Sequence, residues 1–356
     1  MTHPPEIRPS LIGLAIAEIA TLPALLGEPS FRARQVATWI YQKSVGDFAA
    51  MTTLSKSLRD RLAAAHTLAR LPVIACQTST DGTAVKFLFE LSPSQRIEAV
   101  LLRAPRRDTL CISTQAGCGF GCRFCATGAM GFRRNLTVQE ILSQVLALRD
   151  DLRARGGQGF FNLVFMGMGE PLDNYEVLVG AIRVMHEDAG LAVGYRRITV
   201  STVGLPDRIR ALAEEGIPVR LALSLNATDN ETRSSLMPVN RRYPIETLLP
   251  ALAEYRRRTG SRVTLEYILI AGVNDSLGDA RRLARLAAEC GAQINLIRLN
   301  AHPRSALQPS PPERVDVFYQ TMLPLGPAVT LRESRGADIH AACGQLSTTY
   351  EAGTIS

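Results

Sequence analysis

Apolar residues recur at two different spacings along the first hundred positions, and the change of spacing divides this part of the chain into two segments. Up to about residue 70 they return every three or four residues, which is typical of helices that bury one face. In residues 31–43 (FRARQVATWIYQK), Phe31, Val36 and Trp39 share one face, and basic side chains lie mostly on the other. The pattern predicts a small helical domain over residues 1–70, with helices at Leu11–Leu26, Phe31–Lys43 and Leu54–Ala65.

From Leu71 to Arg103 the apolar positions follow the two-residue period of strands. Val85, Phe87 and Phe89 alternate along one run, and the turn-forming Ser92-Pro93-Ser94 leads into a second run, IEAVLLR. The pattern predicts a β-hairpin over residues 71–105 that joins two domains. Glu98 should share a face of the second strand with apolar neighbours, either as a partly solvated strand edge or as a site residue with a perturbed pKa.

From residue 106 to residue 335, apolar runs of strand length alternate with longer amphipathic segments. Thr137-x-x-Glu140 before one of these segments is a capping box. Six βα units fall short of a closed eightfold barrel, so the sequence predicts an α/β fold with an open (βα)6 barrel and a tail over 336–356. The expected strands are 108–113, 161–166, 196–202, 219–225, 262–270, 293–299 and 328–332, and the expected helices are 137–150, 174–189, 206–215, 245–259, 276–290 and 312–323.

Charge and cysteine usage narrow the class of protein. The net charge is +7 with a pI near 9.2, and the arginines are dispersed, which favours a polyanionic partner; a merely basic enzyme is the alternative. No stretch approaches 18 uncharged apolar residues and the start lacks a signal-peptide pattern, so we expect a cytoplasmic protein without membrane contact. A basic face for RNA is expected on the N-terminal helices, from Arg32, Arg34, Lys56 and Arg59.

Three of the seven cysteines lie close together, at Cys118, Cys122 and Cys125. They supply three ligands, whereas a structural zinc site or an electron-transfer cluster usually needs four, and no Cys-x-x-Cys or His-x-His pair elsewhere completes the set. A [4Fe–4S] cluster held by three cysteines would leave one iron open for catalysis. A zinc knuckle or incidental cysteines are the alternative.

Small and polar residues follow the predicted barrel strands, where barrel enzymes place their chemistry. The second strand ends in MGMGEP, whose glycines permit close backbone approach. Each position alone is a weak signal, since polar residues commonly begin loops. Together they predict a cofactor pocket at the carboxyl ends of the strands, formed by Gly169, Glu170, Ser201, Ser224, Leu225, Asn226 and Asn300.

The cysteine spacing, with Phe124 before the last cysteine, resembles the signature of radical S-adenosylmethionine (SAM) enzymes. The resemblance implies that the open iron chelates SAM, that the cluster cleaves it to a 5′-deoxyadenosyl radical, and that Glu170 holds the SAM amino group. Several further segments resemble the RlmN/Cfr family of rRNA methyltransferases, and the RlmN branch most closely. These are FRARQVATWIYQK, LCISTQAGC, GFRRNLT, FMGMGEPL, SLMPVNRRYP, LEYILIAGVND, INLIRLN and RGADIHAACGQL.

The family resemblance implies methylation of adenosine at carbon 2 in 23S rRNA and, as in many bacterial members, in tRNA. It assigns Cys343 as the cysteine that first takes a methyl group from one SAM and, after hydrogen abstraction by the radical from a second, delivers the carbon to the base. Cys111 would resolve the adduct through a transient disulfide, and Glu98 matches a proposed proton acceptor; either could be the base. Asn226 departs from the His of many relatives.

The resemblance also implies a flavodoxin- or ferredoxin-type electron donor, and we expect a monomer. Two alternatives stay open at this stage. One is a Cfr-like methyltransferase acting at carbon 8 of adenosine. The other, of a different class, is a non-enzymatic RNA-binding protein with a structural or redox-sensing iron–sulfur cluster. Cys76 and Cys290 lie in apolar or helical contexts and are interpreted as packing residues.

Overall fold

The computed structural model describes residues 8–157 and 159–348, which form two compact units. Residues 1–7 of the expected helical domain and 349–356 of the expected tail lie outside the described residues. The smaller unit combines the N-terminal region up to Pro72 with Leu136–Gly159 and Glu176–Gly194. The larger unit contains Val73–Asn135, Phe160–Tyr175 and the chain from Tyr195 onward. None of the described helices is long and apolar enough to cross a membrane.

The smaller unit is helical, as the pattern of apolar positions predicted. The expected helix at residues 31–43 is present as α2 (Phe31–Ala37), which continues into a π-helical turn, and its apolar face is buried through Val36 and Ile40. The expected helix Leu11–Leu26 is wrong in its extent, because Gly13 and Gly27 adopt positive φ angles and Pro23 interrupts the run. The helices are α1 (Ile16–Ala20), α2, α3 (Lys56–Ala65), α4 (Val138–Ala154) and most of α5 (Tyr175–His186).

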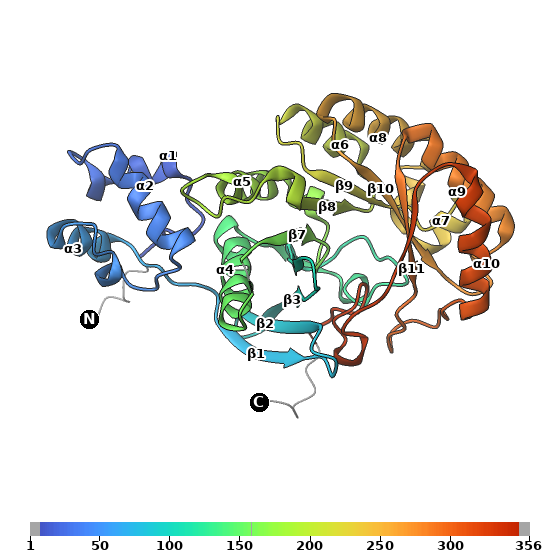
Figure 1. Cartoon of the computed structure of the whole chain (residues 1–356), viewed down its shortest axis with the longest axis horizontal. Helices are drawn as coiled ribbons and strands as arrows, with labels where there is room; N and C mark the ends of the chain where they lie inside the picture. Colours follow the sequence, from blue (N-terminus) through green and yellow to red (C-terminus); the bar gives the residue numbers. More distant parts are fainter. Residues whose placement is uncertain (1–7, 158, 349–356) are drawn as a thin grey trace. The chain divides into compact units, whose positions relative to one another are not determined.

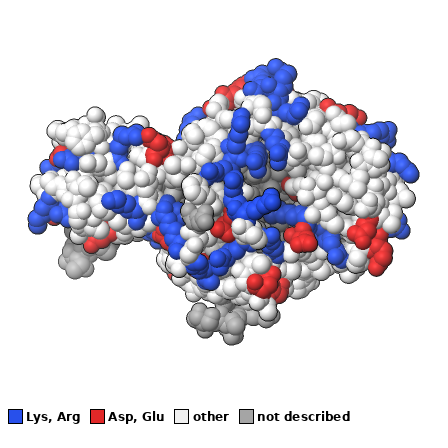
Figure 2. Space-filling model, in the orientation of Figure 1, with Lys and Arg blue, Asp and Glu red and all other residues white. Residues whose placement is uncertain are grey.

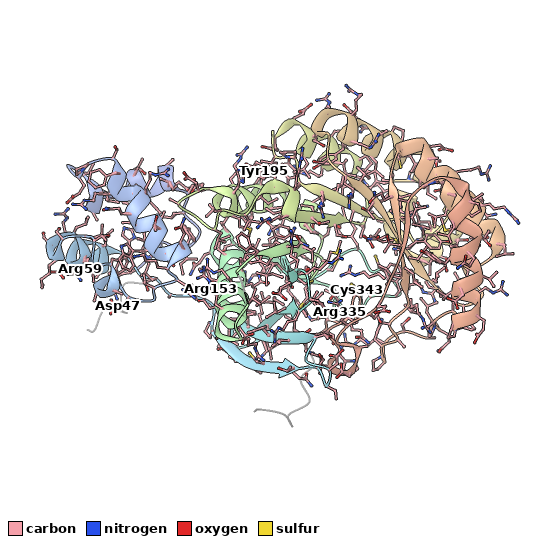
Figure 3. All side chains as sticks on the ribbon, in the orientation of Figure 1. Asp47, Arg59, Arg153, Tyr195, Arg335 and Cys343 are labelled. Carbon is pink, nitrogen blue, oxygen red and sulfur yellow. The ribbon has the colours of Figure 1, made fainter. Side chains whose placement is uncertain are left out.

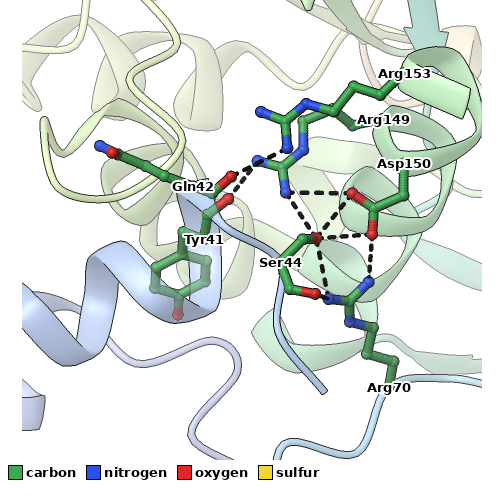
Figure 4. Close-up of polar contacts among 7 residues, drawn as sticks. All are labelled: Tyr41, Gln42, Ser44, Arg70, Arg149, Asp150 and Arg153. Atoms are coloured by element: carbon green, nitrogen blue, oxygen red, sulfur yellow. Dashed lines mark hydrogen bonds and ion pairs between the residues drawn. The ribbon is translucent and has the colours of Figure 1, made fainter. Parts of the chain in front are cut away.

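A buried polar network ties α4 to the N-terminal helices inside this unit (Figure 4). The guanidinium of Arg149 is 3% exposed and donates to the carbonyl of Tyr41 and, at 2.8 Å, to Ser44 Oγ. Asp150 accepts from Ser44 Oγ at 2.7 Å and from Arg70 at 2.7 Å. Burial lowers the pKa of Arg149 to about 10. Because a buried charge is stable only when it is paired, these contacts explain why α4 belongs with residues before 73.

The larger unit is built on one ten-stranded sheet (Figure 1). Seven strands are parallel, in the order β4-β7-β8-β9-β10-β11-β12, and three antiparallel strands extend one edge as β1-β2-β3. The predicted α/β fold with parallel strands is confirmed. The strands are β1 (Val73–Thr78), β2 (Ala84–Ser92), β3 (Gln95–Leu102), β4 (Asp108–Cys111), β7 (Phe161–Phe165), β8 (Ile198–Thr202), β9 (Arg220–Ser224), β10 (Val263–Leu269), β11 (Gln293–Arg298) and β12 (Val329–Arg332).

The predicted hairpin is present as β2 and β3, and it continues the main sheet because β3 pairs antiparallel with β4. Leu110, Leu163 and Leu223 on the parallel strands are fully buried, as expected for strands covered on both faces. Helices follow one another along the outer side of the parallel strands (Figure 1). These are α6 (Pro206–Glu214), α8 (Ile245–Thr259), α9 (Leu277–Cys290) and α10 (Pro312–Met322), and the sequence pattern predicted all four.

One helix and one pair of short strands in the larger unit were not predicted. One is α7 (Asn230–Leu236), which begins where the Asp229 carboxylate accepts a hydrogen bond from Thr232 N. The other is the short antiparallel pair β5 (Gln115–Gly117) and β6 (Phe132–Asn135). β5 and β6 enclose the loop that carries the three clustered cysteines.

Candidate active site

A cavity of about 570 Å³ opens at the carboxyl ends of the parallel strands. Figure 3 labels two of its lining residues, Cys343 and Arg335. Leu225, Asn300 and Glu98, which the sequence also singled out, do not line it. The predicted site residues that line it are Cys111, Cys118, Cys122, Cys125, Gly169, Glu170, Ser201, Ser224, Asn226 and Cys343.

The loop with the three cysteines is held at both ends by the pairing of β5 with β6. Gly117 ends β5 with φ +74°, and a Cβ there would lie 1.9 Å from the carbonyl oxygen of Gly131, so only glycine fits. Cys118 N donates to that same carbonyl at 3.1 Å, and Cys125 N donates to Cys122 O at 3.1 Å. These contacts fold the loop so that all three thiols line one cavity.

Without a bound cation, the surroundings of the three cysteines favour the protonated thiol over the thiolate. Burial raises the pKa of Cys118 to about 12 and that of Cys122 well above its ordinary value, and the negative charge of the neighbouring cysteines raises the pKa of Cys122 further. A positively charged centre would reverse these effects and deprotonate all three. The arrangement therefore fits a metal cluster bound through Cys118, Cys122 and Cys125.

The type of centre follows from how the thiols are spread. In residues 8–157 and 159–348, no three His, Cys, Asp or Glu side chains are close enough together to hold a single metal ion. An iron–sulfur cluster does not require that closeness, because each cysteine binds a different iron. Three cysteines that line one cavity are compatible with a [4Fe–4S] cluster in which each cysteine binds a different iron.

The loop after β7 brings its backbone close to the cysteine loop. Gly169 has φ +98°, and a Cβ there would lie 2.5 Å from the Cβ of Gln115. The next residue, Glu170, is 2% exposed and accepts hydrogen bonds from Leu172 N at 3.1 Å and Val203 N at 2.8 Å. Burial raises the pKa of Glu170 to about 7, although these hydrogen bonds act in the opposite direction. The site thus presents a carboxylate that a cationic or amino group would stabilise.

Residue 226 lies in the wall of the cavity, just after β9. Asn226 adopts φ +59°, a left-handed conformation that Asn tolerates better than most residues. Its side-chain oxygen accepts from Ile268 N at 3.0 Å, and its amide group lies 3.4 Å from Met237 Sδ. Asn226 therefore forms part of the cavity wall, and its side-chain amide is already hydrogen-bonded within the protein.

The segment that carries Cys343 is hydrogen-bonded to the cysteine loop. Gly344 O accepts from Ala126 N at 2.7 Å, and Thr127 Oγ1 donates to Leu346 O at 2.6 Å. Asn300, two residues after β11, donates to Cys343 O at 3.1 Å. Asn300 thus acts on the site through the backbone of Cys343. Residues from two distant parts of the chain therefore hold the backbone of the Cys343 segment at the cavity.

Cys111 ends β4 and faces the same cavity. Burial raises its pKa to about 12, the charge of Cys343 raises it further, and Arg332 lowers it. Arg332, at the end of β12, is partly exposed, and its pKa is raised by the charge of Cys343 and also by Glu266 on β10 and by Cys111. Arg332 and Glu266 were not among the predicted site residues. The signal that could have indicated them is the presence of a charged residue in an otherwise apolar strand.

Glu98 is 1% exposed, so the interpretation as a partly solvated strand edge is wrong. Its carboxylate lies 3.2 Å from Lys86 Nζ, which is 3% exposed, on the neighbouring strand. The other carboxylate oxygen accepts from Ser347 N at 3.0 Å. Glu98 therefore contacts the segment that carries Cys343 from outside the cavity.

Comparisons with known proteins agree with this geometry. The profile of the radical SAM superfamily matches residues 112–284, and the profile of the ribosomal RNA large subunit methyltransferase N-terminal domain matches residues 10–68. The dual-specificity RNA methyltransferase RlmN of Anaeromyxobacter sp. is 46% identical over 347 residues, covering 96% of this chain and 92% of that protein. A Thermotoga maritima relative that bears the RlmN name is 44% identical over 338 residues, covering 95% and 97%.

A solved structure extends the comparison to three dimensions. The crystal structure of a radical SAM methyltransferase from Sphaerobacter thermophilus superimposes with a TM-score of 0.90 at 45% identity. The superposition covers 95% of this chain and 99% of the Sphaerobacter thermophilus chain.

Proposed function

The chain belongs to the RlmN family of radical SAM methyltransferases, and from this premise we propose that it methylates carbon 2 of adenosine in 23S rRNA and in tRNA. Enzymes of this superfamily use a [4Fe–4S] cluster and SAM. The observation that carries the proposal is that Cys343 lines the same cavity as the three clustered cysteines and Cys111. A non-enzymatic iron–sulfur protein would have no use for two further cysteines at that place.

Cys118, Cys122 and Cys125 would hold the cluster, and Glu170 would accept hydrogen bonds from the SAM amino group. When bound, the cluster and SAM supply the methyl group and a radical able to remove a hydrogen atom from it. Carbon 2 of adenine is electron-poor and cannot displace a methyl group from SAM as a nucleophile. A covalent carrier on the protein solves this problem, and the Cys343 sulfur is the group that the site presents for it.

Release of the product requires a second cysteine. Once the carbon carried by Cys343 is bonded to carbon 2 as a radical adduct, the base must lose one electron, which the bound cluster would accept, and the proton at that carbon. The Cys111 thiolate then attacks the Cys343 sulfur and forms a disulfide, while the carbon leaves with the electrons of the broken bond and takes up a proton to become the methyl group. A thiol reductant must reduce the disulfide before the next turnover. Arg332 favours the Cys111 thiolate that this step needs, because its positive charge opposes the effect of burial on the Cys111 pKa.

Replacing Cys111 with alanine should trap the covalent intermediate. Cys343 would still form its bond to the base, but the remaining cysteines of the cavity are assigned to the cluster and would not break the bond between sulfur and carbon. We expect a protein–RNA adduct on denaturing gels and a loss of turnover by about 10³-fold or more. Cys290→Ala is the matched control, since Cys290 is buried in α9 outside the cavity and should turn over normally. Free turnover by the Cys111→Ala variant would remove the role assigned to Cys111.

SAM affinity should depend on pH through Glu170. Because burial raises the pKa of Glu170 to about 7, SAM binding to the ionised carboxylate must expel a proton below this pH. The apparent affinity should therefore weaken by up to tenfold for each pH unit below about 7 and level off above it. Equilibrium binding at about pH 6 and about pH 8 measures the change. The Glu170→Gln variant should bind weakly at both pH values, and an unchanged pH dependence in that variant would show that another group titrates.

The surface offers positive charge to an RNA substrate, and Figure 2 shows lysine and arginine side chains gathered around a hollow in the face that is drawn. Two of the basic residues expected to bind RNA on the N-terminal helices form ion pairs within the protein. Arg34 pairs with Asp188 at 2.6 Å, and Lys56 pairs with Asp60 at 2.8 Å. Exposed pairs of this kind are weak and exchange readily for phosphate, so the proposed RNA face on these helices stands as a prediction.

The experiment that tests the proposed function is the mapping of methylated adenosines in rRNA and tRNA from cells with and without the gene. The proposal requires 2-methyladenosine that disappears with the gene. Appearance of 8-methyladenosine instead would favour the Cfr-like alternative. If no methylated adenosine depends on the gene, and reduced protein does not consume SAM, a non-enzymatic RNA-binding protein remains.

A further inference from the structure

A second cavity, of about 500 Å³, lies at the amino ends of the barrel strands and is lined by four arginines, Arg196, Arg220, Arg256 and Arg262. We call it the arginine site. Arg220 begins β9, Arg196 and Arg262 precede β8 and β10, and Arg256 lies in the last turn of α8. Figure 3 shows Tyr195, which precedes Arg196, well apart from Cys343. The site is therefore separate from the active-site cavity.

The arginines of this site lack acidic partners within the described part of the chain. The lining contains no Asp or Glu, and none of the four arginines forms an ion pair there. Arg258, two residues after Arg256 on α8, shows the contrast. It pairs with Glu214 at 3.0 Å and with Glu254 at 2.9 Å. The same helix thus carries one arginine neutralised by the protein and another left with its charge available.

The four charges also repel one another. Burial lowers the pKa of Arg220, and the positive charges of Arg262 and Arg107 lower it further. Two helix ends lie at the site, since Gly260 and Gly291, the C-caps of α8 and α9, line it. Each helix end carries about half a negative charge, so together they offset about one of the four positive charges. A net charge of about +3 remains for a ligand.

We propose that the arginine site binds phosphate groups of the RNA backbone that flanks the target adenosine. Guanidinium groups donate two hydrogen bonds to a phosphate in parallel, and three of the four side chains are exposed to solvent. An open group of this kind suits several phosphates of a polymer better than one enclosed anion. The inference rests on the proposed function, because it takes RNA as the substrate.

The fold sets the distance between the two sites. Arg220 and Ser224 are the first and last residues of β9, and they line the arginine site and the active-site cavity respectively. Four strand steps separate their Cα atoms by roughly 13 Å. RNA must therefore pass around the barrel from one site to the other. A long structured RNA has enough chain to do so, whereas we expect a short stem-loop seated at the active site to end before the arginine site.

The test compares a long 23S rRNA fragment with a short stem-loop that carries the same target adenosine. In the variant with both Arg220→Gln and Arg262→Gln, we expect about tenfold weaker binding of the long RNA and a salt-dependence slope reduced by about 2. Binding of the stem-loop should be unchanged. Arg258→Gln removes one exposed charge from the same end of the barrel and serves as the control. Iron content and thermal unfolding check that each variant is folded.

Three results would overturn the inference. Equal affinity and slope for the long RNA in wild type and double variant would exclude the contact. An equal loss with Arg258→Gln would indicate general charge instead of this site. A thermal shift by inorganic phosphate that depends on Arg220 and Arg262, without any effect on RNA, would make the ligand a free anion. Failure of the wild type to methylate either RNA would refute the proposed function, while RNA binding still decides the arginine site.

Discussion

The Cys343→Ala variant is expected to lose RNA methylation by about 10³-fold or more while retaining its iron. The reason is that Cys343 is the group proposed to carry the methyl carbon, and the base cannot take that carbon directly from SAM. Cys111 cannot replace it, because Cys111 lies in β4, outside the backbone contacts that hold the Cys343 segment beside the cysteine loop. Quantification of 2-methyladenosine by mass spectrometry of RNA nucleosides measures the loss.

Iron retention is essential to this prediction, because Gly344 and Leu346 are hydrogen-bonded to the cysteine loop. Alanine at position 343 leaves those backbone contacts in place, so the cluster should assemble as in wild type. Cys290→Ala again provides the control with one thiol fewer. Methylation at the wild-type rate by the Cys343→Ala variant would show that another group carries the carbon.

Replacing any one of Cys118, Cys122 or Cys125 with alanine is expected to abolish deoxyadenosine formation and most of the bound iron. The three cysteines supply all the thiolates that line the cavity on the loop between β5 and β6, and two ligands cannot hold a cluster that three hold with one iron open. Iron and sulfide analysis after anaerobic reconstitution, followed by chromatography of the reaction products, measures both effects.

Cys76→Ala is the matched control, since Cys76 lies on β1 and does not line the cavity among the described residues. Cys76 is exposed, so its interpretation as a packing residue is wrong, whereas Cys290 is buried as expected. It should bind iron and form deoxyadenosine like the wild type. Stoichiometric zinc without iron in the active protein would contradict the assignment of a [4Fe–4S] cluster.

The elements that could be predicted are those whose signal is local. Strands β7 to β12 were found because they are short apolar runs between capped amphipathic segments, and α4 because Thr137 and Glu140 form the predicted capping box. The cysteine loop and the Glu170 loop were also visible, because their residue types and spacing are confined to a few positions. Their convergence in one cavity followed from the rule that parallel strands place their carboxyl ends together.

What could not be predicted depends on contacts between residues far apart in the sequence. Lys86 on β2 pairs with Glu98 on the neighbouring strand β3, and this pairing allows the Glu98 carboxylate to be buried. The pattern of the strand alone did not decide whether Glu98 is buried or exposed. The grouping of α4 with the N-terminal helices rests on Arg149 and its partners, more than 100 residues earlier in the chain. Arg332 was overlooked because its position beside Cys111 and Cys343 arises only when β12 pairs with β11.

The most direct test of the central claim is the mass of the peptide that contains Cys343, measured in protein produced with and without an intact cluster site. The account predicts one added methyl group on Cys343 in the wild type, and none in the Cys118→Ala variant. A methyl group on Cys111 instead, an equal modification in both proteins, or an unmodified Cys343 in active wild-type enzyme would contradict it.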